Sequence, residues 1–256
     1  MNGVRAINPK VSILTYHSID DSGSVVSTSR KTFQKQMRSL SESSCNVISL
    51  NAIMDCLHEN RPLPSRALAI TFDDGYRNVY TEAFPILEKY GFGATVFLIS
   101  DYCGKDNDWP GNSPAFERRP LLSWSEIEEM RRHGFEFGAH TATHPDLTRV
   151  SIQQAEREIT GSKAEIEDRL GVEARCFAYP YGKYNSEVQE IVRTQFLGAC
   201  STKLGKVRSD CDPHALRRID MYYLSHPAVF SALEADALEW YLGARQILRD
   251  LKARLI

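Results

Sequence analysis

Residues 67–76, Ala-Leu-Ala-Ile-Thr-Phe-Asp-Asp-Gly-Tyr, join an apolar run to two adjacent carboxylates and a glycine. The run predicts a buried strand, and Asp73 and Asp74 follow at its C-terminal end. Neighbouring residues of a strand point to opposite sides. A turn at Gly75 allows both acids to serve one site, because glycine accepts backbone angles that other residues avoid. The simpler interpretation is an Asp-Gly turn with two solvated acids. Motifs elsewhere in the chain are needed to distinguish this turn from a functional site.

Strand and helix patterns alternate on both sides of this stretch. Short apolar runs predict strands, and helical spacing of apolar residues predicts helices. The strands are expected at 11–15, 47–50, 94–99, 135–139, 176–178 and 197–200, and helices at 30–41, 53–58, 78–90 and 186–195. A further short segment of unassigned type is expected at 216–221. Ser123 and Ser151 open capping-box patterns for two more helices, which Gly134 and Gly171 close. This order predicts an α/β fold with a parallel sheet, open or closed, in a single domain of residues 1–256.

The C-terminal segment predicts one long helix over residues 227–255. Its apolar residues recur along one stripe, which consists of Val229, Leu233, Trp240, Ile247, Leu251 and Leu255. We expect this stripe to pack on the body of the protein. The alternative is that it contacts a membrane surface or a partner.

The composition is that of a water-soluble globular protein. The 256 residues carry a net charge of only −2 and show no basic stripe, which argues against nucleic acid as a partner. No segment has the ~20 apolar residues needed to span a bilayer. Residues 1–10 lack the apolar stretch of a secretory signal. The six cysteines form no CxxC pair and are interpreted as reduced thiols. These features predict a cytoplasmic location.

A second informative stretch is His140-Thr141-Ala142-Thr143-His144-Pro145. If the turn after the predicted strand is helical, the two histidines four residues apart lie on one face and can hold one divalent ion. Asp73 or Asp74 can supply a third ligand. Two imidazoles and a carboxylate, with water in the open position, form a catalytic zinc arrangement. For this spacing alone, surface or helix-capping histidines are the alternative.

The remaining acid of the pair is the candidate general base. If Asp74 binds metal, Asp73 can lie within hydrogen-bonding reach of the attacking water. A third stretch, Phe177-Ala178-Tyr179-Pro180-Tyr181-Gly182, also follows a predicted strand. In a parallel barrel all three stretches fall on the C-terminal rim, where such folds place their active sites. This shared placement is stronger evidence than any single motif.

Together, the three stretches resemble the polysaccharide deacetylase family, which has a NodB-like domain and is also known as carbohydrate esterase family 4. The resemblance covers roughly residues 11–220 and implies a distorted (β/α)7, TIM-like barrel. It implies that Asp73 is the base. It also implies that Asp74, His140 and His144 hold zinc or a similar divalent ion, and that the backbone N–H of Tyr181 helps to stabilise the oxyanion.

Two departures from the family pattern concern the other catalytic roles. The family has an arginine that orients the base where Ala178 stands here, and we expect Arg218 to replace it. The late Leu-x-His motif that supplies the general acid is not evident. The subgroup that deacetylates poly-N-acetylglucosamine carries a Tyr-His near the first strand, and Tyr16-His17 matches it. The resemblance therefore implies His17 as the acid. His214, or a purely structural role for His17, is the alternative.

These features predict a metal-dependent hydrolase that removes an acyl group from the nitrogen of an amino sugar. The resemblance implies that this group is acetyl. The glycine- and proline-rich segment 101–122 is expected to contact the substrate through Trp109. One alternative is an amidohydrolase or deformylase that acts on a small cyclic amide or a lipid-linked amino sugar. A nucleotide- or lipid-linked sugar would fit the predicted cytoplasmic location. A non-catalytic carbohydrate-binding protein on the same fold is the other alternative.

Overall fold

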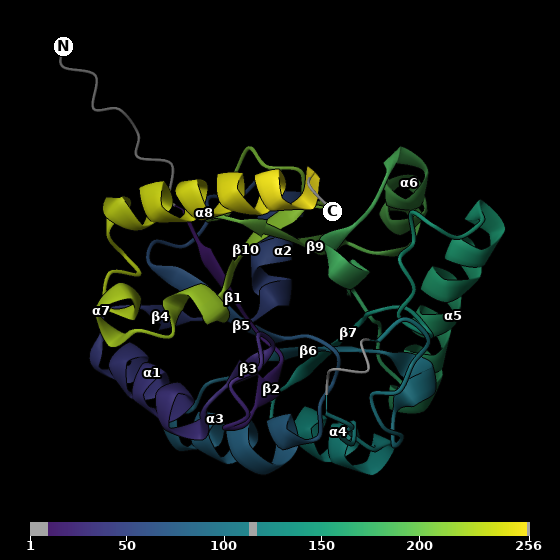
Figure 1. Cartoon of the computed structure of the whole chain (residues 1–256), viewed down its shortest axis with the longest axis horizontal. Helices are drawn as coiled ribbons and strands as arrows, with labels where there is room; N and C mark the ends of the chain where they lie inside the picture. Colours follow the sequence, from purple (N-terminus) through teal and green to yellow (C-terminus); the bar gives the residue numbers. More distant parts are fainter. Residues whose placement is uncertain (1–9, 113–116, 255–256) are drawn as a thin grey trace.

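Seven parallel strands form a closed ring at the centre of the computed structural model, which describes residues 10–112 and 117–254 (Figure 1). In ring order the strands are β1 (Ser12–Tyr16), β5 (Ala67–Phe72), β6 (Thr95–Leu98), β7 (Glu136–Ala139), β8 (Cys176–Ala178), β9 (Gly198–Leu204) and β10 (Leu216–Asp220). The ring closes because β1 pairs in parallel with both β5 and β10. This confirms the expected (β/α)7 barrel.

Three short strands lie outside the ring. β4 (Asn46–Val47) pairs with the first two residues of β5. β2 (Ser18–Ile19) pairs with β3 (Ser27–Thr28) in a separate ladder. The predicted strand at 47–50 is therefore too long. Leu50 instead begins α2 (Leu50–His58), because the hydroxyl of Ser49 accepts a hydrogen bond from Ala52 N and caps the helix.

The strands are buried on both faces. All six residues of β5 are buried, and alternate residues belong to different apolar clusters. Ala69 packs inside the barrel together with Ile13, whereas Ile70 packs toward the surrounding helices. Met54 of α2 belongs to the inner cluster and lies against Gly198 at the start of β9. α2 thus covers the N-terminal end of the barrel and leaves the opposite rim for the site.

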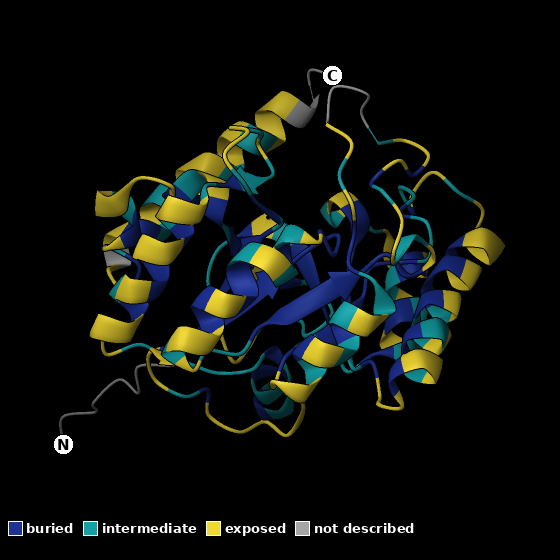
Figure 2. Ribbon diagram, turned by 90° about the horizontal axis from the view of Figure 1, so that it is seen from below, coloured by how far each residue is buried: buried dark blue, intermediate teal, exposed yellow. Residues whose placement is uncertain are grey.

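Helices surround the ring with their inner faces buried and their outer faces exposed (Figure 2). They are α1 (Arg30–Glu42), the π-helical turn η1 (Val79–Ala83) that runs into α3 (Phe84–Tyr90), α4 (Trp124–Arg132), α5 (Ile152–Leu170) and α6 (Ser186–Gln195). At α4 the predicted capping box is complete: Ser123 and Glu126 each accept a hydrogen bond from the other's backbone N–H. At α5, Ser151 caps Gln154 N.

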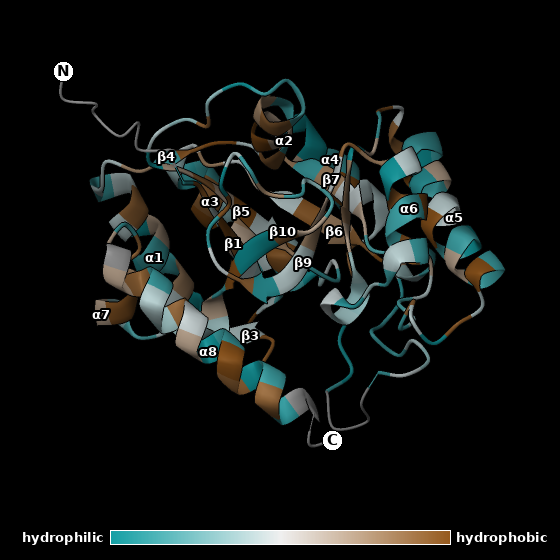
Figure 3. Cartoon of the chain, turned by 90° about the horizontal axis from the view of Figure 1, so that it is seen from above, coloured by the Kyte–Doolittle hydropathy of each residue, from teal (hydrophilic) through white to brown (hydrophobic). Residues whose placement is uncertain are grey.

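The C-terminal segment forms two helices, α7 (Pro227–Phe230) and α8 (Asp236–Arg254), rather than one. The prediction that its apolar stripe packs on the body is wrong for Trp240, Ile247 and Leu251, whose exposed fractions are 84%, 62% and 51%. Figure 3 shows hydrophobic and hydrophilic positions interspersed along α8.

α8 instead packs through another face. Leu238 and Leu242 are buried there. Further along, the Gln246 side chain accepts a hydrogen bond from Leu204 N at 2.8 Å, and Arg249 donates to Thr202 O at 2.9 Å. The packed face of α8 therefore consists of the two leucines in its first half and of residues hydrogen-bonded to β9 in its second half. Within the described part of the chain, no helix combines the length and apolar character that crossing a bilayer requires.

Gly138 in β7 leaves no room for a side chain. A Cβ there would lie 2.7 Å from the Cys176 carbonyl oxygen and from two atoms of the Phe97 ring. We therefore expect Gly138→Ala to lower the free energy of unfolding by about 1–3 kcal/mol, measured by denaturant titration. Gly161→Ala in α5 is the matched control, because a Cβ there meets nothing within 4 Å. It should leave stability unchanged or raise it by up to about 1 kcal/mol. Equal effects of the two variants would contradict this account.

Candidate active site

The C-terminal rim of the barrel gathers the residues singled out in the sequence. Asp73 and Asp74 directly follow β5, His140 directly follows β7, and His17 directly follows β1. Several rim residues have left-handed backbone conformations, which are costly for residues other than glycine. They are Asp74 (φ 67°), Thr141 (φ 70°), His144 (φ 60°) and Tyr181 (φ 58°). Such conformations cluster where a fold holds functional side chains in fixed positions.

Asp74, His140 and His144 form one buried group whose ligand atoms lie within 4.8 Å of one another. The Oδ1 atom of Asp74 lies 3.4 Å from Nε2 of His140 and 3.5 Å from Nε2 of His144. The sequence had left open which acid joins the histidines, and the geometry selects Asp74. Burial would raise the pKa of Asp74, but the hydrogen bond from His140 and the nearby histidine charges outweigh it and hold the pKa well below its usual range.

The two histidines converge for a different reason from the one that their spacing suggested. Residues 140–144 are not helical. Instead, the Thr141 hydroxyl accepts a hydrogen bond from His144 N at 2.9 Å, and the left-handed residues at both positions fold the chain back. The two ring centroids are 4.8 Å apart. The expected pairing of the rings is present, but the predicted helical turn is wrong.

The donor set fits a divalent cation. The Ala178 carbonyl accepts a hydrogen bond from His140 Nδ1 at 2.7 Å, so in the neutral ring, once Nε2 gives up its proton, the lone pair lies on Nε2, the atom that faces Asp74. Burial, followed by the charge of His140, lowers the pKa of His144 to about 3, and this favours the neutral imidazole that metals require. Two imidazole nitrogens and one carboxylate oxygen are ligands that divalent first-row metals accept.

Asp73 makes a bidentate ion pair with Arg218 of β10. Their atoms are separated by 2.7 Å (Nη1 to Oδ1) and 2.6 Å (Nη2 to Oδ2), and both side chains are buried. The guanidinium also donates to Ser201 O at 3.0 Å. Burial alone would raise the pKa of Asp73, but the charge of Arg218 and its hydrogen bonds outweigh burial and lower the pKa. The arrangement keeps Asp73 ionised and fixes its orientation.

The structure also separates the two histidines considered for the general acid. Nε2 of His17 lies 3.8 Å from Oδ2 of Asp73, and His17 lines the same cavity as the metal-ligand candidates. His214 is not among the residues that line this cavity. Its ring donates a hydrogen bond to Phe196 O at 3.0 Å. The placement favours His17.

A small cavity of about 170 Å³ opens over the acids and histidines. Its further lining residues are Val26, Tyr76, Trp109, Asn112, Tyr179, Tyr181 and Thr202. Trp109, predicted from the long segment, packs 5.0 Å from the His144 ring, and its buried indole N–H has no hydrogen-bond partner among the described residues. Likewise, none of the described residues accepts a hydrogen bond from the backbone N–H of Tyr181. The Tyr181 N–H therefore remains available to a substrate.

Sequence reasoning missed part of this lining. Thr202, Asn112 and Val26 carry no motif, and they reach the cavity from β9, from the 101–122 segment and from the segment before β3. Thr202 packs against Gly182, where a Cβ would lie 2.1 Å from the Thr202 hydroxyl. The polar residues Ser201, Thr202 and Lys203, which follow the apolar start of β9, were the one signal that the sequence offered for Thr202.

Comparison with known proteins agrees with this geometry. The family model for polysaccharide deacetylase matches residues 60–196, more than half of the chain. The chain belongs to the polysaccharide deacetylase family. The matched region contains Asp73, Asp74, both metal-ligand histidines and Tyr181, whereas His17 and Arg218 lie outside it. Enzymes of this family act on acetylated carbohydrates.

Individual members resemble the chain along most of its length. YxkH of Bacillus subtilis (strain 168) is 28% identical over 82% of this chain and 71% of that protein. Poly-beta-1,6-N-acetyl-D-glucosamine N-deacetylase of Staphylococcus aureus (strain MRSA252) is 25% identical over 65% of this chain. The match spans 58% of that protein's length. The solved structure of IcaB from Ammonifex degensii superposes with a TM-score of 0.75 at 26% identity, covering 90% of this chain and 97% of that one.

Proposed function

We propose that the protein is a metal-dependent hydrolase that removes an N-acetyl group from an amino sugar in a glycan, oligosaccharide or sugar conjugate. The observation that carries the proposal is the buried group of Asp74, His140 and His144 beside the ionised Asp73, on one rim of the barrel. Family membership and a relative named as a poly-beta-1,6-N-acetyl-D-glucosamine N-deacetylase support it. The complete set of residues argues against the alternative of a non-catalytic binding protein.

The metal site is proposed to consist of Asp74 Oδ1 and the Nε2 atoms of His140 and His144, with zinc as the preferred ion. When bound, such an ion supplies a Lewis acid that polarises the acyl carbonyl and acidifies water. The Nδ1–H···O=C bond from His140 to Ala178 fixes the ring for this role.

The other residues move protons and stabilise charge. Asp73, held by Arg218, accepts the proton of the attacking water. The free backbone N–H of Tyr181 donates to the oxyanion that develops on the acyl oxygen. His17, at the mouth of the cavity, donates a proton to the leaving nitrogen as the C–N bond breaks. The products are acetate and the free amine.

The cytoplasmic location remains part of the proposal. All six cysteines are free thiols, which supports a reducing compartment. Peripheral contact of α8 with a membrane stays a prediction; the exposed side chains of Trp240, Ile247 and Leu251 are its support.

Acetate release from a panel of N-acetylated sugars tests the proposal. The panel contains N-acetylglucosamine oligomers, a sugar nucleotide and a lipid-linked sugar, with the enzyme loaded with Zn²⁺ or treated with chelator. We expect release that chelator abolishes and added Zn²⁺ restores, because the reaction would need the ion that Asp74, His140 and His144 are proposed to hold. Formate release from the N-formylated forms of the same sugars, with no acetate release from the N-acetylated forms, would redirect the proposal to deformylation. If the Zn²⁺-loaded protein released neither, the proposal would be wrong.

A further inference from the structure

Two segments outside the barrel ring form part of the wall of the catalytic cavity. Residues 17–28, which include β2 and β3, contribute His17 and Val26, and the segment before α4 contributes Trp109 and Asn112. β2 pairs with β3 in a two-stranded ladder that is separate from the ring. A ladder of this size is only marginally stable in water by itself. The position of this wall therefore depends on side-chain contacts with neighbouring segments.

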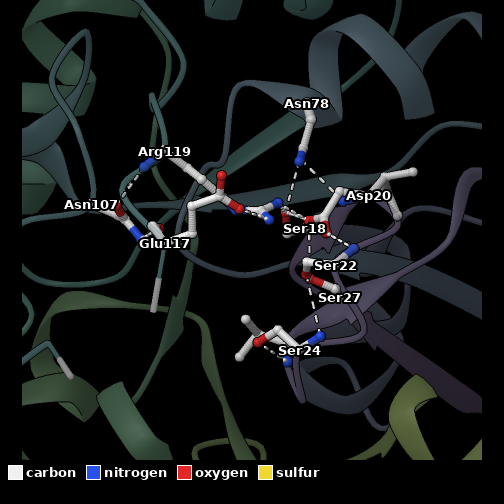
Figure 4. Close-up of polar contacts among 11 residues, drawn as sticks. Ser18, Asp20, Ser22, Ser24, Ser27, Asn78, Asn107, Glu117 and Arg119 are labelled. Atoms are coloured by element: carbon white, nitrogen blue, oxygen red, sulfur yellow. Dashed lines mark hydrogen bonds and ion pairs between the residues drawn. The ribbon is translucent and has the colours of Figure 1, made fainter. Parts of the chain in front are cut away.

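Arg119 joins the two segments. Its guanidinium forms an ion pair with Asp20 and donates a hydrogen bond to Ser18 Oγ at 3.2 Å (Figure 4). Within its own segment it pairs with Glu117 at 2.8 Å, and its backbone N–H donates to Asn107 Oδ1 at 2.7 Å. The side chains of Arg119 and Asp20 are only 18% and 17% exposed. Water and salt therefore screen this ion pair less than they screen a surface pair.

Asp20 connects Arg119 to both strands of the ladder. It accepts hydrogen bonds from Ser18 Oγ in β2, from Ser27 Oγ in β3 at 2.9 Å and from Ser22 N at 2.8 Å (Figure 4). Burial would raise the pKa of Asp20, but these hydrogen bonds lower it to about 2, so the carboxylate is ionised at neutral pH. Ser18 and Ser27 directly adjoin the two residues of this segment that line the catalytic cavity. A side chain that holds Asp20 therefore also holds both lining residues.

A second cavity, of about 410 Å³, separates the two segments beside the ion pair. Residues 22–27 line it on one side, and Asn107 and Arg119 line it on the other. Because this cavity takes the place of side-chain packing, the position of residues 22–27 depends on the polar contacts. Val26 lines both this cavity and the catalytic cavity, so a shift of residues 22–27 would change the shape of the catalytic cavity.

We propose that Arg119 is a positioning residue for the catalytic reaction and acts through Asp20 on His17 and Val26. Arg119 is not among the residues that line the catalytic cavity. The inference rests on the proposed function, in which His17 protonates the leaving nitrogen. Nε2 of His17 lies 3.8 Å from Oδ2 of Asp73, and a misplacement of about 1 Å at a catalytic group can cost about 10²-fold in rate. The three metal-ligand candidates follow the ring strands β5 and β7, and their positions should not depend on Arg119.

Kinetics of Arg119 and Asp20 variants test the inference. Arg119→Met should lower kcat/KM for acetate release by about tenfold or more, with bound zinc unchanged. The substrate is the N-acetylated sugar that the wild type deacetylates fastest. Asp20→Asn should cause a similar loss, and the double variant should be no worse than either single variant, because all three remove one interaction. Arg119→Lys keeps the charge opposite Asp20 and should be at least about threefold more active than Arg119→Met.

Arg118→Met is the matched control in the same segment. The Arg118 side chain is 69% exposed and pairs with Asp106 and Asp108 of its own segment, so it does not join the two walls. The change should leave kcat/KM within about twofold of the wild type, because exposed ion pairs contribute little. Equal losses in Arg118→Met and Arg119→Met would contradict the inference.

Hydrogen exchange of the ligand-free protein separates failure of the positioning from failure of the proposed function. The backbone N–H groups of Ser18 and Asp20 donate to Val26 O and Thr28 O, both at 3.0 Å. In Arg119→Met these two amides should exchange about tenfold faster or more, while those of β5 and β7 exchange as in the wild type. If exchange responds in this way and the wild type releases no acetate from any sugar, the proposed function is wrong, but Arg119 still holds the wall.

Three results would overturn the inference in a folded Arg119→Met protein. They are unchanged exchange at Ser18 and Asp20, unchanged kcat/KM, and a loss that adds to that of Asp20→Asn in the double variant. If Arg119→Met does not fold, Asp20→Asn replaces it in both measurements, because the amide keeps the shape of the side chain and removes only the charge that Arg119 faces.

Discussion

Asp73→Asn is expected to lower kcat for acetate release by about 10²–10⁴-fold, the range that general-base catalysis contributes. The amide keeps the shape of the side chain but cannot accept the proton of the attacking water. Bound zinc, measured by atomic emission, should remain at the wild-type level because Asp74, His140 and His144 are untouched. A rate close to that of the wild type would show that another group takes the proton.

The same variant also leaves the buried guanidinium of Arg218 without its counter-charge. Some loss of stability is therefore expected, and rates must be measured well below the unfolding temperature of the variant. Loss of activity with normal metal content and a folded circular dichroism spectrum would assign the effect to chemistry. Loss of metal as well would mean that Asp73, not only Asp74, is a ligand.

Arg218→Met is expected to cost about 3–5 kcal/mol of unfolding free energy, the usual penalty for leaving a buried charge without its partner. Asp73 would lose both charge-assisted hydrogen bonds, of 2.7 Å and 2.6 Å. Activity should fall as well, since nothing then orients the base. Arg217→Met on the same strand is the matched control, because its side chain is exposed; the change should stay within about 0.5 kcal/mol.

A double variant, Asp73→Asn with Arg218→Met, distinguishes the two roles of the pair. Removing both charges should recover most of the stability lost in Arg218→Met, because no unpaired charge remains in the interior. Activity should stay as low as in Asp73→Asn. A double variant as unstable as Arg218→Met alone would mean that packing of the arginine side chain, rather than its charge, holds this part of the barrel.

Much of the fold could be predicted from local patterns. The strand 176–178 and the helix 186–195 have the predicted bounds, because apolar runs and helical spacing are local properties of the sequence. The errors fall where tertiary contacts decide. Trp240 lies on an apolar stripe yet is exposed, since α8 packs through Leu238 and Leu242 and is joined to β9 on that side by hydrogen bonds of Gln246 and Arg249.

The candidate site shows the same division. Asp73 and Asp74 stand out because two acids end an apolar strand, and the histidine pair stands out by its spacing. The backbone that brings His140 and His144 together could not be predicted, because it depends on left-handed residues that are neither glycine nor asparagine. The pairing of Arg218 with Asp73 joins strands that lie far apart in the chain, and only the family pattern suggested it.

The cavity of about 410 Å³ between segment 22–27 and Arg119 could not be predicted from the sequence. Asp20 and Arg119 lie about a hundred positions apart, and each by itself resembles an ordinary surface charge. Serine-rich segments such as 22–27 are typical of loops and predict nothing beyond a turn. Their contribution comes from the contact between the two segments, which the closed barrel brings about.

Ring closure through β1 also has a consequence for synthesis on the ribosome. β1 and β5 emerge early and pair with each other, but the partner strand on the other side, β10, joins β1 through residues more than 200 positions away. Non-local pairing of this kind forms late, because closing the long intervening loop costs conformational entropy. Arg218 belongs to β10, so a nascent chain holds Asp73 without its counter-ion until β10 has been synthesised. The last strand to arrive therefore both seals the barrel and completes the catalytic base.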